Sequence, residues 1–228
     1  RGDRARELCW ELDRKVLQGM HFAANLFAAD GAIRLDGQLQ DFIAPPNRAS
    51  IGASLSGIKQ AIDLLSRAWP GTVTREDMIR HAALTQGTAD AVSPEVLGEA
   101  IDELCGRLAL RGLAVFRLEP VEVAASSDHP FVDPVVMRQV AALLPDRKHV
   151  ANAWHDSVEI TQIDRLLVPL MDGTVDRAGL VAAAAAAIRD GRLPSSSSED
   201  VDSQAATRVT EMLQRLAGSA MLLRHVPQ

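Results

Sequence analysis

Residues 150 to 188 read VANAWHDSVEITQIDRLLVPLMDGTVDRAGLVAAAAAAI, and this stretch says more about the fold than any other part of the chain. Val150–Ile160 is strand-like, with Trp154-His155-Asp156 near a turn and alternation at Val158 and Ile160, which predicts a short β-hairpin. Thr161 is a preferred N-cap residue, and the apolar residues after it recur at helical spacing. Gly173 supplies the left-handed backbone that ends a helix, and Asp176 then caps a second helix through the alanine run. We therefore expect a hairpin followed by two helices.

The same stretch carries a residue pattern that resembles a known family. The matching residues are Asn152, Trp154, His155, Asp156, Val158, Leu166, Leu167, Pro169, Leu170, Met171, Asp172, Gly173, Thr174, Asp176, Arg177 and Leu180. This pattern is similar to the tail of bacterial S-adenosylmethionine-dependent methyltransferases that carry a methyltransferase regulatory domain, some of which act on protein lysines. Asp156 stands where that family usually has glutamate. Near the start, Arg6–Cys9 and Leu17–Leu26 resemble the beginning of the same region, although a phenylalanine typical of the family is missing there.

The resemblance implies a division of roles within a larger protein. A Rossmann-like catalytic domain that binds S-adenosylmethionine would precede Arg1, and protein lysines would be its substrate. The chain starts with arginine rather than methionine, so we interpret it as a piece of a longer polypeptide. This piece would be non-catalytic and would hold no cofactor of its own. Its expected partners are the methyltransferase catalytic domain, in the same polypeptide, and a protein substrate.

The composition indicates a folded, cytoplasmic protein. The chain has 228 residues, 47% of them hydrophobic, which suits one large core or two small ones. No stretch is apolar enough to span a bilayer, and the charged start does not resemble a signal peptide, so we expect no membrane partner. The formal net charge of −6 argues against general affinity for nucleic acid. Cys9 and Cys105 fit no metal spacing, and we expect reduced, buried thiols.

The order of the predicted elements favours an α+β fold, mostly helical, with two small winged-helix-like modules that carry short β-hairpins. Residues 1–48 are expected to form a helix and a hairpin. Residues 49–125 are expected to form three helices and a hairpin, which is the order of a winged helix. Residues 126–228 are expected to form a second module of helices and a hairpin, with a mobile, serine-rich loop near 193–202.

Local signals set the expected boundaries within these segments. Thr74 and Ser93-Pro94 are expected to begin the second and third helices of the middle segment, and Ser54 or Ser56 the first. Pairs of short strands are expected where turn residues separate apolar runs. The expected elements are a helix at Arg4–Leu17, a hairpin of Met20–Ala28 with Ala32–Leu35, a loop at Gln38–Arg48, a hairpin of Leu113–Leu118 with Val121–Ala124, and a final strand at Met221–Leu223.

The sequence contains none of the common catalytic signatures. The strand, glycine-rich turn and helix that hold S-adenosylmethionine are not found. Gly52 and Gly57 in IGASLSG come closest, and we interpret them as loop and N-cap glycines. His149, His155 and Asp156 lie near one another in sequence, but a metal site there is disfavoured because a turn would separate the two histidines. No catalytic, cofactor-binding or metal-binding residue is therefore assigned.

Trp154, His155 and Asp156 are the residues at which we predict contact with a partner. A tryptophan beside a turn can anchor an interface, and this chain has only 4% aromatic residues and no tyrosine. The favoured alternative is that Trp154 packs over its own small domain with its indole N–H satisfied locally. His155 either forms hydrogen bonds within the module or lies on an edge that faces a partner.

A winged-helix order also raises the alternative of a DNA-binding transcription regulator. In such proteins the third helix enters the major groove, where it meets phosphates. The corresponding stretch here, Pro94–Arg111, has four acidic and two basic residues, a net charge of −2: Glu95, Glu99, Asp102 and Glu103 against Arg107 and Arg111. Phosphates would repel this helix, so DNA binding is the weaker prediction.

Overall fold

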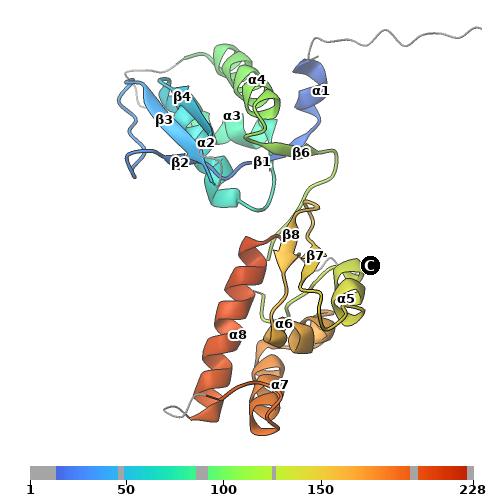
Figure 1. Cartoon of the computed structure of the whole chain (residues 1–228). Coiled ribbons are helices and arrows are strands. Elements are labelled where there is room, and N and C mark those ends of the chain that lie inside the picture. The colour runs from blue at the N-terminus through green and yellow to red at the C-terminus, as the bar shows by residue number, and fades with distance from the viewer. Residues whose placement is uncertain (1–13, 46–48, 86–91, 125–126, 196–199, 225–228) are drawn as a thin grey trace, which may run out of the picture. The chain divides into compact units, whose positions relative to one another are not determined.

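The computed structural model describes residues 14–45, 49–85, 92–124, 127–195 and 200–224. The chain forms two compact units, residues 1–120 and residues 121–228 (Figure 1). The described elements are mostly helices with small antiparallel sheets, which confirms the predicted α+β class. None of the described helices combines the length and the hydropathy that a transmembrane span needs.

The first unit does not divide where the sequence suggested. Residues from both of the first two predicted segments share one hydrophobic core, so 1–48 and 49–125 are not separate there. Its elements are α1 (Arg14–Gln18), β1 (His21–Ala23), β2 (Phe27–Ala28), β3 (Gln40–Ala44), β4 (Ala49–Ala53), α2 (Ser56–Ala68), β5 (Val73–Thr74), α3 (Arg75–Thr85), α4 (Pro94–Leu110) and β6 (Val115–Arg117). The expected helix at Arg4–Leu17 falls mainly on residues 1–13, outside the described part of the chain.

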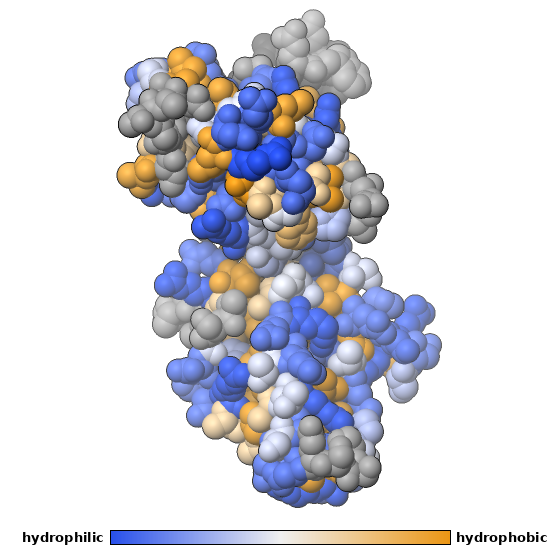
Figure 2. All heavy atoms as spheres, turned by 90° about the vertical axis from the view of Figure 1, so that its left-hand side faces the viewer, coloured by the Kyte–Doolittle hydropathy of each residue, from blue (hydrophilic) through white to orange (hydrophobic). Residues whose placement is uncertain are grey.

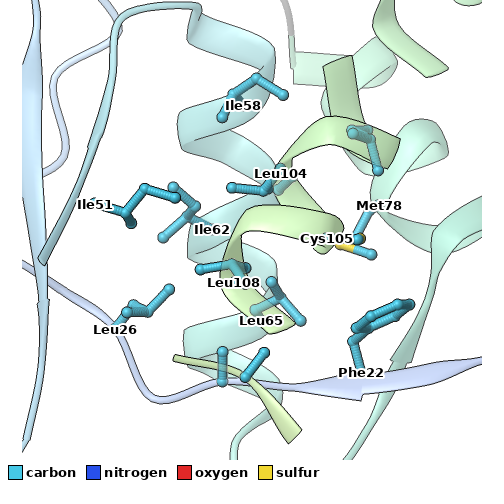
Figure 3. Packing of buried hydrophobic residues seen from close by; sticks show 14 of the residues in the cluster. Phe22, Leu26, Ile51, Ile58, Ile62, Leu65, Met78, Leu104, Cys105 and Leu108 are labelled. Atoms are coloured by element: carbon cyan, nitrogen blue, oxygen red, sulfur yellow. The ribbon is translucent and has the colours of Figure 1, made fainter. Parts of the chain in front are cut away.

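Helices α2, α3 and α4 form the helical layer of this core. Apolar residues of α2 recur at helical spacing, and Ile58, Ile62 and Leu65 are all buried. They face Met78 of α3 and Leu104 of α4, while residues of the strands close the other side (Figure 3). Their spacing in the sequence also predicts core positions for Trp69 and Val96, but Trp69 is only half-buried and Val96 is half-exposed. The same prediction for Trp10 falls outside the described residues.

The sheet next to these helices has the strand order β5-β1-β6. The predicted hairpin of Leu113–Leu118 with Val121–Ala124 is wrong, because β6 pairs with β1 instead, with Phe22 opposite Phe116. The two phenylalanine rings lie with centroids 6.2 Å apart, and Phe22 is fully buried. Burial of Phe22 and its contact with the partly exposed Phe116 favour the long-range pairing over the local one. β1, which precedes the three helices in the sequence, therefore forms the central strand of this sheet.

The second sheet of this unit has the order β2-β3-β4. The predicted return strand at Ala32–Leu35 and the predicted loop at Gln38–Arg48 are both wrong, because the strand that pairs with β2 is β3. The single strand expected over Met20–Ala28 is likewise broken into β1 and β2. Phe42, expected to hold a loop, is a fully buried strand residue in the middle of β3.

Two buried polar side chains explain why the segment between β2 and β3 is not a strand. Lys59 of α2 is fully buried, and its ammonium donates to the carbonyl of Arg34 at 2.7 Å and to Asp36 Oδ1 at 3.3 Å. The Gln40 amide donates to Asp30 Oδ1 at 2.7 Å, and its carbonyl accepts from the Arg34 backbone N–H at 3.0 Å. Lys59 and Gln40 thus supply the hydrogen bonds that a neighbouring strand would otherwise make to the backbone of this loop.

The ends of the three helices follow the predicted caps in two cases. Thr74 Oγ1 accepts from the backbone N–H of Asp77 at 3.1 Å, and Ser93 accepts from Val96, so both predicted N-caps are confirmed. The prediction for α2 is wrong: its N-cap is Leu55, and no side chain caps it.

A buried ion pair joins α3 to α4. Arg75 donates from Nε to Asp102 Oδ1 at 2.5 Å and from Nη2 to Asp102 Oδ2 at 3.0 Å, and this hydrogen bonding raises the pKa of Arg75. Gln18 of α1 donates to the same carboxylate at 3.5 Å. One turn further along α4, burial raises the pKa of the Cys105 thiol to about 12. Cys105 is thus the buried thiol that the sequence predicted, whereas Cys9 lies outside the described residues.

The second unit carries the predicted hairpin and helix pair. Its elements are α5 (Pro134–Ala141), β7 (His149–Ala151), β8 (Ser157–Glu159), α6 (Gln162–Leu167), the 3-10 helix η1 (Val168–Leu170), α7 (Arg177–Arg189) and α8 (Val201–Gly218). Thr161 caps α6, Asp176 caps α7, and Gly173 has a φ of +87°, so these three predictions are confirmed. The helix after Thr161 is shorter than expected, since the backbone tightens into η1 at Val168.

Two predictions in this unit need correction. Met221–Leu223 is not a strand; Leu222 and Leu223 form only isolated bridges, with Val132 and Val123 respectively. The loop expected near 193–202 ends earlier, because Asp200 caps α8, which starts at Val201. Residues 196–199 of that loop lie outside the described part of the chain.

Candidate partner-binding site

The predicted contact residues lie in the turn between β7 and β8. The strands pair in antiparallel register, His149 with Glu159 and Ala151 with Ser157. The five residues between them form a turn built around Asn152, which is buried. Asn152 Oδ1 accepts from the backbone N–H groups of Trp154 and Asp156, both at 2.8 Å.

Asn152 also ties the turn to the end of α8. Its Nδ2 donates to the carbonyl of Ser219 at 3.0 Å, so a single side chain holds both segments. His155 has a φ of +61°, a conformation uncommon for a residue other than glycine. The asparagine that the family pattern contains is therefore a structural residue here, which positions its three neighbours.

The three predicted contact residues are exposed to different extents. His155 and Asp156 are exposed, whereas Trp154 is half-buried. Trp154 therefore packs partly on its own unit and keeps part of its side chain exposed. The turn presents a histidine and a carboxylate to solvent, on a backbone fixed by Asn152.

A groove lies beside the hairpin, with a volume of about 480 Å³. One wall is the end of α5 and the residues after it, and the other is the hairpin. The sequence predicted that a turn would keep His149 and His155 apart, but both side chains line this groove. The lining residues are Gln139, Ala142, Leu143, Leu144, Arg147, His149, Val150, Ala151, His155 and Ser157.

The α5 wall of the groove is held by Arg165. Its guanidinium donates to the carbonyls of Leu143 at 2.9 Å, Leu144 at 3.1 Å and Arg147. On the other wall, Gln139 Oε1 accepts from the backbone N–H of Ala151 at 3.1 Å, which closes part of the β7 edge. The groove is therefore a fixed feature of the unit rather than a gap between unconnected segments.

Ser157 and the two histidines line this groove together. No hydrogen bond among the described contacts joins Ser157 to His149 or His155, the contact by which a histidine activates a serine nucleophile. Within the described ranges no group of three or more histidine, cysteine, aspartate or glutamate residues could hold a metal ion. Figure 2 shows polar and apolar residues mixed over the visible face of each unit.

The described strands do not form a Rossmann-type site for S-adenosylmethionine. Such a site uses a parallel strand followed by a glycine-rich turn and a helix, whereas every pair of described strands is antiparallel. Gly52 lies within β4 and Gly57 in the first turn of α2, so their interpretation as loop and N-cap glycines is wrong. A Cβ at Gly52 would meet the Leu39 side chain at 3.1 Å, which shows close packing rather than a phosphate-sized space.

Asp164 holds the end of the hairpin to α6 and α8, and this role was not predicted from the sequence. Asp164 Oδ2 accepts from the backbone N–H and Oγ1 of Thr161 at 2.6 and 2.7 Å, which makes a capping box. Its other oxygen accepts from Arg215 of α8, and Arg215 also donates to the carbonyl of Glu159 at 3.4 Å. The threonine followed three residues later by an acidic residue was the available signal.

Replacing Asn152 by alanine should cost the second unit about 1–3 kcal/mol of stability, because two backbone N–H groups and one carbonyl lose their partner. Urea denaturation followed by Trp154 fluorescence measures the loss, in a background with Trp10→Phe and Trp69→Phe. Asn152→Asp is the matched control, since it keeps the oxygen acceptor but not the donor to Ser219. An alanine variant as stable as the parent would show that the turn does not depend on Asn152.

The second unit belongs structurally to the small helical domains that carry a β-hairpin. Residues 128–221 match the family model of the PKMT C-terminal winged helix domain, where PKMT is a protein lysine methyltransferase. This match confirms the resemblance seen in the sequence. No curated protein matches the chain.

Solved structures of a protein lysine methyltransferase share the fold. PKMT2 from Rickettsia typhi has a TM-score of 0.72 with this chain at 12% sequence identity, over 93% of this chain and 44% of that one. The same protein in complex with AdoHcy has a TM-score of 0.74 at the same identity and coverage. The chain therefore spans less than half the length of the solved proteins that it resembles. The DNA-binding alternative is not favoured by these matches.

Proposed function

We propose that this chain is the non-catalytic, regulatory or substrate-recruiting region of an S-adenosylmethionine-dependent protein methyltransferase, and that it acts through protein contacts. The observation that carries the proposal is the match of residues 128–221 to the winged helix domain of PKMT. The similarity of fold over 93% of the chain supports it for the first unit as well.

The partner in this proposal is a catalytic domain in the same polypeptide. The solved PKMT2 that binds AdoHcy is more than twice as long as the stretch that this chain covers, which leaves ample length for such a domain. Among the described residues, no parallel strand leads into a glycine-rich turn that could hold the cofactor. The chain would then position protein substrates, with the groove beside Trp154, His155 and Asp156 as one contact surface.

The test compares the intact methyltransferase with a version that lacks residues 1–228. Transfer of labelled methyl groups to protein substrates should fall at least about tenfold, which corresponds to about 1.4 kcal/mol of lost interaction. Binding of S-adenosylmethionine should remain within about threefold, since the cofactor site lies elsewhere. Adding residues 1–228 as a separate chain provides the control for a truncated protein that is merely unstable.

Two results would contradict the proposal. One is equal methylation of the same substrates with and without residues 1–228. The other is binding of S-adenosylmethionine to residues 1–228 alone, which would place the cofactor site in this chain.

A further inference from the structure

β4 is an edge strand, and the hydrogen bonds around it show which of its backbone groups face outward. The N–H of Ala29 donates to the carbonyl of Asp41 at 2.9 Å, so the backbone of Asp41 points toward β2. Directions alternate along a strand, and Phe42, opposite Ile51, therefore bonds toward β4. By the same alternation, residues 50 and 52 of β4 direct their N–H and C=O groups away from β3.

A contact on the outer side supports this assignment. Arg111, just after α4, donates from Nη1 to the carbonyl of Ser50 at 3.0 Å. Gly52, the next outward-facing residue, is exposed, and no hydrogen bond among the described contacts uses its N–H or C=O. A sheet edge with such groups is a template for pairing with another strand.

A cleft runs beside this edge, between β4, the start of α2 and one face of α4. Its volume is about 190 Å³, which is below the range of about 300–1,000 Å³ for small-molecule pockets but enough for a side chain. Ile58 and Leu104 line its apolar floor and approach each other from α2 and α4 (Figure 3). Leu55, also in the lining, is partly exposed.

α4 carries an acidic stripe that continues from the cleft toward the start of the helix. Glu95, Glu99 and Glu103 recur at intervals of four residues, so they form one stripe along the helix. Glu103 lines the cleft together with Arg107, to which it is paired at 2.8 Å. Glu95, Glu99 and Glu103 against Arg107 give the stripe a net charge of −2, and Arg111 at the Ser50 end of the edge reduces it to −1. The excess of carboxylates lies on Glu95 and Glu99, beyond the cleft lining, and it favours a cation over a phosphate.

We propose that the β4 edge and the acidic face of α4 bind an extended, lysine-bearing segment of a protein by strand addition. The segment pairs its backbone with Gly52 and with the N–H of Ser50, whose carbonyl already accepts from Arg111, as in known β-augmentation complexes. A lysine on its inward side lays its aliphatic stem over Leu104 and Ile58 and brings its ammonium to the glutamates of α4. This inference rests on the proposed function, because it names the kind of segment that such a region recruits.

The backbone part of the proposal is tested with Gly52 variants of the full chain. The probe is a labelled seven-residue peptide that alternates valine and lysine, and fluorescence anisotropy reports binding. Gly52→Pro removes the outward N–H, and edge strands tolerate proline, so binding should weaken at least about tenfold. Gly52→Ala adds the same Cβ beside Leu39 but keeps the N–H, and should bind within about threefold of the parent.

The charge part is tested with Glu99→Lys, which should weaken binding of the lysine peptide at least about fivefold at low salt. Glu211→Lys makes the same charge change on α8 in the second unit and should leave binding unchanged. A peptide with glutamate in place of lysine should bind at least about tenfold more weakly. Backbone amide resonances of Ser50 and Gly52 should shift on titration with the lysine peptide, and N-methylation of that peptide at alternate residues should abolish the shifts.

The inference is overturned if the lysine peptide does not bind, or if the lysine and glutamate peptides bind equally. It is also overturned if Gly52→Pro binds as tightly as Gly52→Ala, or, should the proline variant not fold, if the N-methylated peptide binds as well as the unmodified one. None of these measurements requires methyl transfer. A failure here leaves the proposed function standing, and a failure of the truncation experiment leaves this binding result interpretable.

Discussion

Replacing Asp164 by alanine is expected to destabilise the second unit by about 3–5 kcal/mol, the cost of leaving one member of a buried ion pair without its partner. The Asp164 side chain is fully buried, and Arg215 is about one-third exposed. Both carboxylate oxygens are in use, one by the Thr161 cap and the other by Arg215. The variant loses the N3 half of the α6 capping box and leaves the Arg215 guanidinium without its carboxylate partner.

Urea denaturation followed by Trp154 fluorescence measures this loss, again with Trp10→Phe and Trp69→Phe. Asp202→Ala is the matched control, because Asp202 pairs with Arg189 on the surface, with both side chains more than half exposed. The control should cost less than about 1 kcal/mol. If Asp164→Ala cost no more than the control, α6 and α8 would not be joined through this carboxylate.

Replacing Asp102 by alanine is expected to destabilise the first unit by about 3 kcal/mol for the same reason, although this carboxylate is slightly exposed whereas that of Asp164 is fully buried. The side chains of Arg75 and Asp102 are 19% and 12% exposed, and the pair is bidentate. Removal of the carboxylate leaves Arg75 of α3 and Gln18 of α1 without their common acceptor.

Two controls separate the ion pair from other effects of the substitution. Glu103→Ala removes an exposed pair with Arg107 on the same helix and should cost only about 0.3–0.5 kcal/mol. The double variant Arg75→Met/Asp102→Leu should recover most of the lost stability, because apolar residues of similar volume often replace a buried pair without cost. Fluorescence of Trp69 reports this unit in a background with Trp10→Phe and Trp154→Phe. A double variant as unstable as Asp102→Ala would place the cost elsewhere.

The sequence predicted features that depend on neighbouring residues. Thr161, Gly173 and Asp176 each set a helix end through backbone geometry or a nearby hydrogen bond, and all three hold. The hairpin around residue 154 also follows from a local pattern.

Features that depend on distant residues could not be read in the same way. The loop after β2 is held by Lys59, whose ammonium bonds to Arg34, 25 positions away in sequence. The pairing of Phe22 with Phe116 joins strands separated by three helices. His149 and His155 share one groove only because α5 supplies its other wall. None of these contacts produces a regular spacing of residues that could be recognised in the sequence.

The central position of β1 limits how the first unit can be shortened. β5 and β6 both pair with residues 21–23 and not with each other. A fragment that started at residue 49, as the winged-helix order alone would suggest, would keep two flanking strands and lose the one that joins them. Val73 and Phe116 would then present unpaired backbone to other chains, which favours self-association over a folded monomer. Expression boundaries for this unit should therefore fall before His21.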